Sequence, residues 1–292
     1  MPARFRIGVV GAGRVGPTLG LALQRAGHSV VAVTRSRSEE SNDRVAALLP
    51  DAQIADADQV VEASDLVIVA VPDDQIVPVV DGLAKLQVWR ANQIVVHPCG
   101  AHGVAALSGA SAAGAIPIAL HPAMTFTGTS LDVDRLVNCP VAVTAPAVGI
   151  AIGQALVMEM GATPYVVEEE DRAVYHAALA HGANYLVTIV SQAVTALSKA
   201  GIDEPAEYIQ PLLNAALERA LSEGAAGLTG PVVRGDTGTI STHMDALRNA
   251  GLESVARTYM DMAEATAQQA NEVGLIDDAT AEAIHAELLY RR

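Results

Sequence analysis

The chain contains few cysteine, aromatic or lysine residues. Its 292 residues include two cysteines, Cys99 and Cys139, and Phe, Trp and Tyr together make up only 3%. Two cysteines this far apart form neither a disulfide framework nor a zinc-binding pattern, so a reducing, cytoplasmic environment is expected. The only lysines are Lys85 and Lys199. A mechanism that needs a lysine amine therefore has few candidates.

Positive charge and long apolar runs are also scarce. The 18 Lys and Arg residues are outnumbered by 33 Asp and Glu residues, which gives a formal net charge of −15. This balance argues against nucleic acids and anionic membranes as partners. No basic region followed by an apolar run opens the chain, so no signal peptide is predicted. The longest weakly polar stretch, 141–160, is broken by Pro146 and Gln154, and it predicts a strand and a buried helix rather than a membrane span.

Strand and helix patterns divide the sequence into two domains. Up to residue 168 they alternate, which is typical of a doubly wound parallel sheet in an α/β domain. The expected strands are residues 5–10, 29–34, 52–55, 65–71, 93–97, 115–120, 139–144 and 164–167. Beyond them only helical patterns occur, beginning with one long helix. We therefore expect domains at 1–168 and 169–292, the second of them all-helical.

The strongest motif is a G-x-G-x-x-G that starts at Gly11, between an apolar strand pattern and a helical one. In this setting Gly11 permits a tight turn, Gly13 lets backbone N–H groups approach phosphates, and Gly16 lets the helix pack against the strand. The N–H groups around Arg14 and Val15 open the helix, where a dinucleotide pyrophosphate would bind. The alternative, a glycine-rich turn without a ligand, is less favoured.

The residues that follow the second strand predict which dinucleotide binds. An NAD site has Asp or Glu about 20 residues after the glycine motif, whereas this chain has Thr34, Arg35, Ser36 and Arg37. Two guanidinium groups and two hydroxyls suit the 2′-phosphate of NADP, because arginine donates paired hydrogen bonds to phosphate oxygens. The alternative is a solvated loop whose arginines pair with the two glutamates at 39–40. We favour NADP(H).

Three later strands end at the edge of the sheet where ligands bind in such folds. The fourth leads into Val71 and Pro72, and the fifth ends at His97, beside the expected nicotinamide ribose. The sixth is followed by His121, whose imidazole can donate a proton near neutral pH. The alternative is a histidine that only orders the His-Pro turn. A metal site built on His97, Cys99 and His102 matches no established spacing, so no metal is predicted.

Six motifs make the chain similar to known proteins: residues 11–16, 65–73, 97–103, 120–122, 184–186 and 228–236. They resemble the 6-phosphogluconate dehydrogenase-like superfamily of NAD(P)-dependent reductases, which includes ketopantoate reductase and pyrroline-5-carboxylate reductase. Within it, the match is to an uncharacterised family that joins a Rossmann-like domain to a helical domain of unknown function. The resemblance implies an oxidoreductase with a Rossmann-type sheet, a helical dimer interface and a substrate site between the domains. It names no substrate.

The long helix departs from the superfamily pattern. Many members have Lys-x-x-x-Asn there, whereas this chain has Ala180 and Asn184. That difference argues against a mechanism with a helix lysine. Asn184 is predicted to hydrogen-bond a substrate oxygen or the carboxamide of the nicotinamide. His176 or His181 would then be the proton donor in place of the lysine ammonium. Positions 176, 180 and 184 are expected to share one helix face, and the alternative is plain helix packing around a buried Asn.

A second glycine-rich loop contains Arg234 and opens another helix. Free N–H groups at this helix start, with Thr237 or Thr239 as cap, would form an anion site, and Arg234 would clamp a carboxylate. Pyrroline-5-carboxylate reductases have a similar Gly/Thr-rich helix start for the substrate carboxylate. His243 follows Thr239 by one turn and is expected to face the same pocket. The alternative is ordinary capping with an Arg234–Asp236 ion pair.

The sequence therefore predicts a cytoplasmic, NADP(H)-dependent reductase for a small carbonyl or imine substrate that carries a carboxylate. His121 or a helix histidine would supply the proton, and Asn184 with the Arg234 segment would hold the substrate. A homodimer through the helical domain is expected. The alternative function is an NADP(H)-binding redox sensor without turnover, which the missing helix lysine favours.

Overall fold

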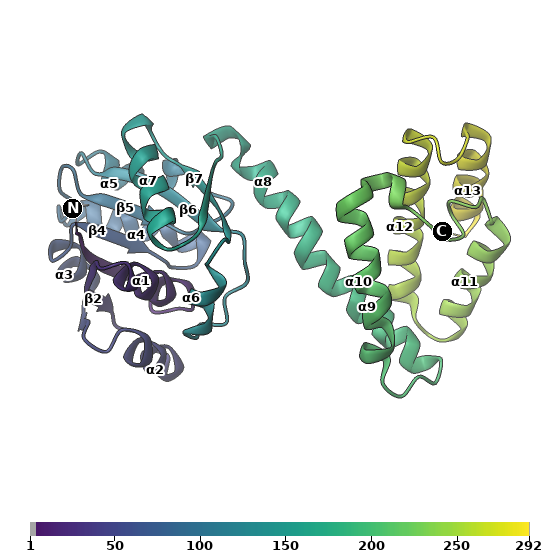
Figure 1. Ribbon diagram of the computed structural model, residues 1–292, viewed down its shortest axis with the longest axis horizontal. Helices are drawn as coiled ribbons and strands as arrows, with labels where there is room; N and C mark the ends of the chain where they lie inside the picture. The colour runs from purple at the N-terminus through teal and green to yellow at the C-terminus, as the bar shows by residue number, and fades with distance from the viewer. Residues whose placement is uncertain (1–3, 292) are drawn as a thin grey trace. The chain divides into compact units, whose positions relative to one another are not determined.

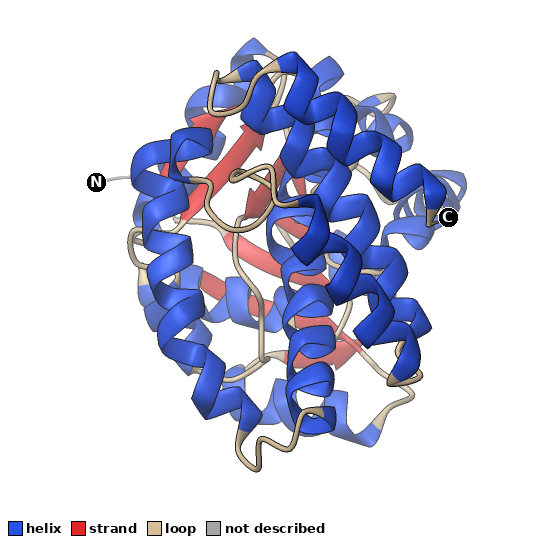
Figure 2. Ribbon diagram, turned by 90° about the vertical axis from the view of Figure 1, so that its right-hand side faces the viewer, coloured by secondary structure: helices blue, strands red, loops and turns tan. Residues whose placement is uncertain are grey.

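The computed structural model describes residues 4–291, which form two compact units that divide after Ala180. Every strand of the described chain belongs to the first unit, and the second is entirely helical (Figures 1 and 2). Over these residues, no helix is both long and apolar enough to cross a membrane. The predicted order, an α/β domain followed by a helical domain, is confirmed.

The first unit is built on one eight-stranded sheet with the order β3-β2-β1-β4-β5-β6-β7-β8. The strands are β1 (Arg6–Val10), β2 (Ser29–Thr34), β3 (Gln53–Ala55), β4 (Leu66–Val69), β5 (Ile94–His97), β6 (Ile116–Pro122), β7 (Pro140–Thr144) and β8 (Thr163–Val166). All neighbours run parallel except β6 and β7, which are antiparallel. The fully parallel sheet expected from the sequence is corrected here. The β6–β7 connection holds only the short helix α6 (Leu131–Arg135), so the chain does not return across the sheet before β7 begins.

Helices cover both faces of the sheet, and Figure 1 shows two of them, α1 and α7, in front of it. One face packs against α1 (Val15–Arg25), α2 (Glu39–Leu48), α6 and α7 (Ala147–Glu159). The other packs against α3 (Ala57–Glu62), α4 (Asp73–Lys85), the 3₁₀ turn η1 (Val104–Leu107) and α5 (Ser108–Ser111). Ile7 and Val9 belong to the first core and Val10 to the second. Because strands buried on both faces read as continuous apolar runs, the central strands, such as β4 and β5, were visible in the sequence, whereas β3 and β8 are largely exposed.

The chain after β8 is nearly continuous helix, as predicted. This part of the chain begins with η2 (Glu169–Asp171), α8 (Arg172–Leu179), a π-helical turn (Ala180–Asn184) and α9 (Tyr185–Lys199). In a π turn the hydrogen bonds run from i to i+5. The common face expected for residues 176, 180 and 184 stays a prediction. Such turns occur frequently at functional sites.

The second unit has one well-covered core and two uncovered helices. Its further helices are α10 (Pro205–Glu223), the 3₁₀ turn η4 (Gly224–Gly227), α11 (Thr237–Asn249), α12 (Glu253–Glu272) and α13 (Asp278–Tyr290). Ile240, Met244 and Ile284, from α11 and α13, are fully buried in a core shared with α12. By contrast, α9 and α10 contain no buried residue. Leu212 and Leu221 of α10 are 68% and 81% exposed.

Candidate functional site

Three glycines shape the turn between β1 and α1. Gly11 has φ +117°, and a Cβ there would lie 2.2 Å from the Ala70 oxygen and 3.1 Å from the Val71 nitrogen, so only glycine fits. A Cβ on Gly16 would lie 2.7 Å from the Gly11 oxygen, which reflects the close packing of α1 on the strand. A Cβ on Gly13 would meet nothing within 4 Å. The turn thus has the tight bend, the close packing and the open approach that the motif requires.

The start of α1 is free to hold an anion. The helix begins at Val15 after Arg14, no side chain caps it, and its first turn contains no acidic residue. The first N–H groups and the positive end of the helix dipole are therefore available to a phosphate. The Gly11 N–H donates to Thr34 Oγ1 over 2.8 Å. This bond fixes the end of β2 against the glycine turn.

Two exposed arginines follow Thr34. In the described part of the chain, neither Arg35 nor Arg37 forms an ion pair. Glu40 instead pairs with Arg44, with 2.6 Å between Nη2 and Oε1. Glu40 therefore does not pair with Arg35 or Arg37, contrary to the alternative in which the neighbouring glutamates neutralise these arginines. Guanidinium groups donate paired hydrogen bonds to phosphate oxygens, and a role of these two arginines in binding the 2′-phosphate stays a prediction.

His97 at the end of β5 faces inward. It is fully buried, its Nε2 lies 2.9 Å from the Gly103 oxygen, and its Nδ1 accepts the Cys99 N–H over 3.2 Å. With both nitrogens used, and with burial lowering its pKa to about 4, the ring is neutral and orders the loop. Burial also raises the pKa of the Cys99 thiol, which keeps this cysteine protonated. Among residues 4–291, no group of three or more His, Cys, Asp or Glu side chains could hold a metal ion.

His121 on β6 lies in a cluster of polar rings. Its Nδ1 is 2.9 Å from the Tyr175 hydroxyl, and the His176 ring stands perpendicular to it at 5.9 Å between centroids. A Cβ on Gly100 would lie 2.9 Å from His121 Nε2, so the loop after β5 packs on the same ring. Burial, and next the charge of Arg172, lower the pKa of His121 to about 4. At neutral pH the ring is therefore a neutral imidazole. If it donates its proton, it must take up another proton from a neighbouring group.

Tyr175 and Arg172 were missed by the sequence reasoning. Both lie on α8, one turn apart, and both reach the loop and strand ends of the first unit. Burial raises the pKa of the Tyr175 hydroxyl, and the nearby Arg172 charge opposes this rise. Arg172 is only 1% exposed although it is a charged residue. Buried charged residues are rare, so an arginine at the start of an apolar helix is a sign of a special role. The residues that it contacts lie far away in the sequence, so the local pattern does not identify them.

The second unit separates several residues that the sequence grouped together. His181 and Asn184 lie in the π turn and are exposed. Arg234 lines a cavity of about 560 Å³ formed with residues 274–277 and Thr280. His243 has its Nδ1 2.9 Å from the Tyr259 hydroxyl and lines another, apolar cavity of about 700 Å³ between α9, α10, α11 and α12.

The cap of α11 corrects the predicted anion site. Asp236, not Thr237 or Thr239, precedes the helix and accepts the Thr239 N–H over 2.9 Å and the Thr239 hydroxyl over 2.6 Å. These bonds hold the pKa of Asp236 below its usual range, so the carboxylate stays charged. It already occupies the helix start and repels a second anion there. Thr239 is not among the residues lining the His243 cavity, so their expected common pocket is not found in the described chain.

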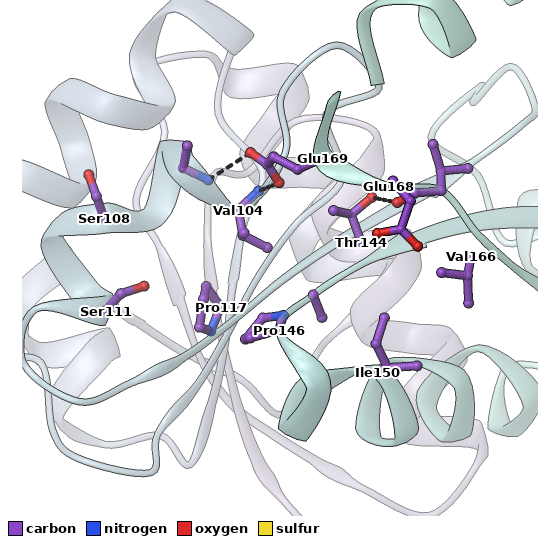
Figure 3. A pocket seen from close by; sticks show the side chains of 13 residues that line it. Val104, Ser108, Ser111, Pro117, Thr144, Pro146, Ile150, Val166, Glu168 and Glu169 are labelled. Carbon is purple, nitrogen blue, oxygen red and sulfur yellow. Dashed lines mark hydrogen bonds between the residues drawn. The ribbon is translucent and has the colours of Figure 1, made fainter. Parts of the chain in front are cut away.

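A further cavity of about 570 Å³ lies along η1, α5 and α7 (Figure 3). The Glu169 carboxylate at its rim accepts the N–H groups of Val104 and Ala105 over 2.8 and 3.1 Å. Its lining contains none of the residues predicted for the site. The candidate site of the first unit is therefore the edge of the sheet, from the glycine turn to the His121 cluster.

Comparisons with known proteins agree with this fold. Residues 1–122 match the Rossmann-like domain, and residues 139–266 match a domain of unknown function, DUF2520. No protein with a curated description matches the chain in sequence.

Many solved structures share the fold. A Bacteroides fragilis protein provisionally named an NADP oxidoreductase is 23% identical, with a TM-score of 0.73 over 90% of this chain and 98% of that one. An imine reductase from Myxococcus stipitatus in complex with NADP⁺ is 17% identical, with a TM-score of 0.64 over 97% and 99%. A Plasmodium falciparum pyrroline carboxylate reductase with NADP bound is 12% identical, with a TM-score of 0.56 over 89% and 98%.

Proposed function

Since this chain belongs to the proteins that join a Rossmann-like domain to the domain DUF2520, we propose that it is an NADP(H)-dependent oxidoreductase. The observation that carries the proposal is the pair of unneutralised arginines, Arg35 and Arg37, next to a glycine turn with an open helix start. The turn would hold the pyrophosphate, and the arginines would hold the 2′-phosphate. The names of the similar structures, two of which contain NADP, support the same cofactor.

The proposed reaction is the reduction of a small carbonyl or imine compound that carries a carboxylate. Bound NADPH supplies a hydride to the substrate carbon. The proton for the oxygen or nitrogen would come from the His121–Tyr175 pair, whose hydrogen bond is 2.9 Å long. Asn184 and Arg234 remain predicted substrate contacts of the second unit. The imine and pyrroline carboxylate reductases among the similar structures support this substrate class.

The purified chain, tested with NADPH and a panel of 2-oxo acids and cyclic imino acids, provides the direct test. Loss of NADPH absorbance that depends on one panel member supports the reductase. Tight NADPH binding without oxidation supports the second candidate, an NADP(H)-dependent sensor. The replacement of the helix lysine by Ala180 favours that candidate.

A second copy of the chain is the proposed partner. Helices α9 and α10, 15 and 19 residues long, bury none of their residues, although Val187, Leu212 and Leu221 are large apolar side chains that are more than half exposed. Monomeric proteins rarely leave so much contiguous apolar surface in water. A homodimer that covers both helices would remove it.

A further inference from the structure

The Arg172 guanidinium is buried with part of its hydrogen-bonding capacity unused. Its Nε donates to the His102 oxygen over 3.1 Å, and its Nη2 donates to the Cys99 oxygen over 2.5 Å. These bonds tie the start of α8 to the loop after β5. The third nitrogen, Nη1, is buried and has no hydrogen-bond partner in the described chain. Three of the five N–H groups of the guanidinium are therefore unused.

The same guanidinium also lacks a negative partner. Arginine stays charged in proteins, and buried charges are normally paired. None of the ion pairs between described residues includes Arg172. Glu169, whose charge acts on Arg172, has its two oxygens on the N–H groups of Val104 and Ala105 rather than on the guanidinium. Arg172 therefore has no directly hydrogen-bonded counter-ion among the described residues.

The groups around Arg172 are those of the candidate active site. The guanidinium carbon lies 5.8 Å from the centre of the Tyr175 ring, and its charge acts on His97 and His121, which burial keeps neutral. Asp73, the acid that also acts on these histidines, is exposed at the start of α4. A cavity of about 360 Å³ borders Arg172; Glu169 and Glu170 also line it, whereas His121 and Tyr175 do not.

We propose that Arg172 binds the carboxylate of the substrate, through Nη1 and the unused N–H of Nη2. This inference rests on the proposed reductase function and names the carboxylate anchor within the first unit. The anion is not the cofactor pyrophosphate: β6 is three strands away from β1, about 14 Å at the usual spacing, while the glycine turn follows β1. Because the guanidinium carbon lies 5.8 Å from the centre of the Tyr175 ring, a carboxylate bound to Arg172 would be near the His121–Tyr175 pair.

The test uses the full chain, with pyruvate as the carboxylate probe and methyl pyruvate as its uncharged counterpart. The imidazole NMR signals of His121 and the pH at which it titrates report on the charge beside it. Pyruvate should shift these signals saturably and raise the pKa of His121, because the carboxylate neutralises Arg172. Methyl pyruvate should not. The variant Arg172→Gln should weaken pyruvate binding at least about tenfold, and Arg172→Lys, which keeps the charge, should weaken it less.

The proposal would be overturned if pyruvate caused no shift, or if Arg172→Gln bound pyruvate as tightly as the unmodified chain. In that case Nη1 would bind only a water molecule. NADPH affinity, measured on the same samples, serves as the folding control and should change less than about twofold in both variants. It also separates the two proposals. Loss of NADPH binding in the unmodified chain contradicts the reductase function, whereas the pyruvate titration tests Arg172 by itself.

Discussion

The imidazole of His121 and the hydroxyl of Tyr175 are joined by a hydrogen bond of 2.9 Å, although 54 positions separate them in the sequence. One comes from the sixth strand of the sheet and the other from α8. Both are partly buried, and burial lowers the pKa of His121 and raises the pKa of Tyr175. A neutral ring bonded to a phenol forms a short path along which a proton can move.

Tyr175→Phe tests this path. Removing the hydroxyl should lower the turnover number by at least about 100-fold, the usual effect of a general acid, and leave NADPH affinity unchanged. Steady-state rates on whichever panel substrate is reduced provide the measurement. The matched control is Tyr165→Phe on β8, where the side chain is 57% exposed and lies outside the cluster. Full activity in Tyr175→Phe would remove Tyr175 from the mechanism.

The three glycines of the first turn should respond differently to alanine. Gly13→Ala places its Cβ in open space, so it should leave the stability unchanged and weaken NADPH binding. Gly16→Ala should destabilise the fold by about 1–3 kcal/mol, because its Cβ would lie 2.7 Å from a backbone oxygen. Urea unfolding followed by Trp89, the single tryptophan and a buried residue of the first unit, measures stability. Equal effects of both variants on both readouts would contradict the assigned roles.

The arginines after β2 should decide between the two nicotinamide cofactors. Arg35→Asp should weaken NADPH binding at least about tenfold more than NADH binding, since only NADPH carries the 2′-phosphate. Arg25→Asp makes the same change of charge on α1, at a residue paired with Asp134, and serves as the control. Calorimetric titrations with both cofactors give the comparison. Equal losses for NADPH and NADH in Arg35→Asp would refute the 2′-phosphate assignment.

The sequence predicts those parts of the fold and of the candidate site that depend on neighbouring residues in the chain. The β4 strand is an unbroken apolar run, and the glycine turn carries its own spacing, so both were located correctly. The Asp236 cap was missed because Asp and Thr are both good caps, and only the backbone geometry decides between them. Tyr175 and Arg172 act on strands far away in the sequence. No spacing rule links such residues.

Acidification should destabilise the first unit through its buried histidines. The pKa of His97 is about 4 in the folded chain, against about 6.5 when unfolded, so between these pH values only the unfolded chain takes up the proton. The free energy of unfolding therefore falls as the pH drops through this window, by up to about 3 kcal/mol for His97. His121, shifted in the same direction, adds to the loss.

The urea midpoint of Trp89 fluorescence, compared between pH 7 and pH 5, measures this effect. His97→Asn should reduce the difference between the two pH values, whatever its own stability. His285→Asn, at an exposed histidine of the second unit bonded to Glu264, should leave it unchanged. A pH dependence as steep in His97→Asn as in the unmodified chain would mean that His97 does not titrate as described.

Charges on the uncovered helices should separate the proposed dimer. Leu212→Glu combined with Leu221→Glu places two carboxylates in the apolar surface of α10, and the particle mass should fall to that of one chain. Leu86→Glu, at a leucine of the first unit that is 63% exposed, should leave the mass unchanged. Light scattering after size-exclusion chromatography reads the mass. A single-chain mass for the unmodified protein would contradict the dimer.

The proposed function requires that the glycine turn and the arginines beside it hold NADP(H). Isothermal titration calorimetry of the ligand-free chain with NADPH and with NADH tests this directly. We predict that NADPH binds, and binds at least about tenfold more tightly than NADH, a difference of about 1.4 kcal/mol. No detectable heat of binding with either cofactor, at concentrations well above those at which such enzymes saturate, would contradict it.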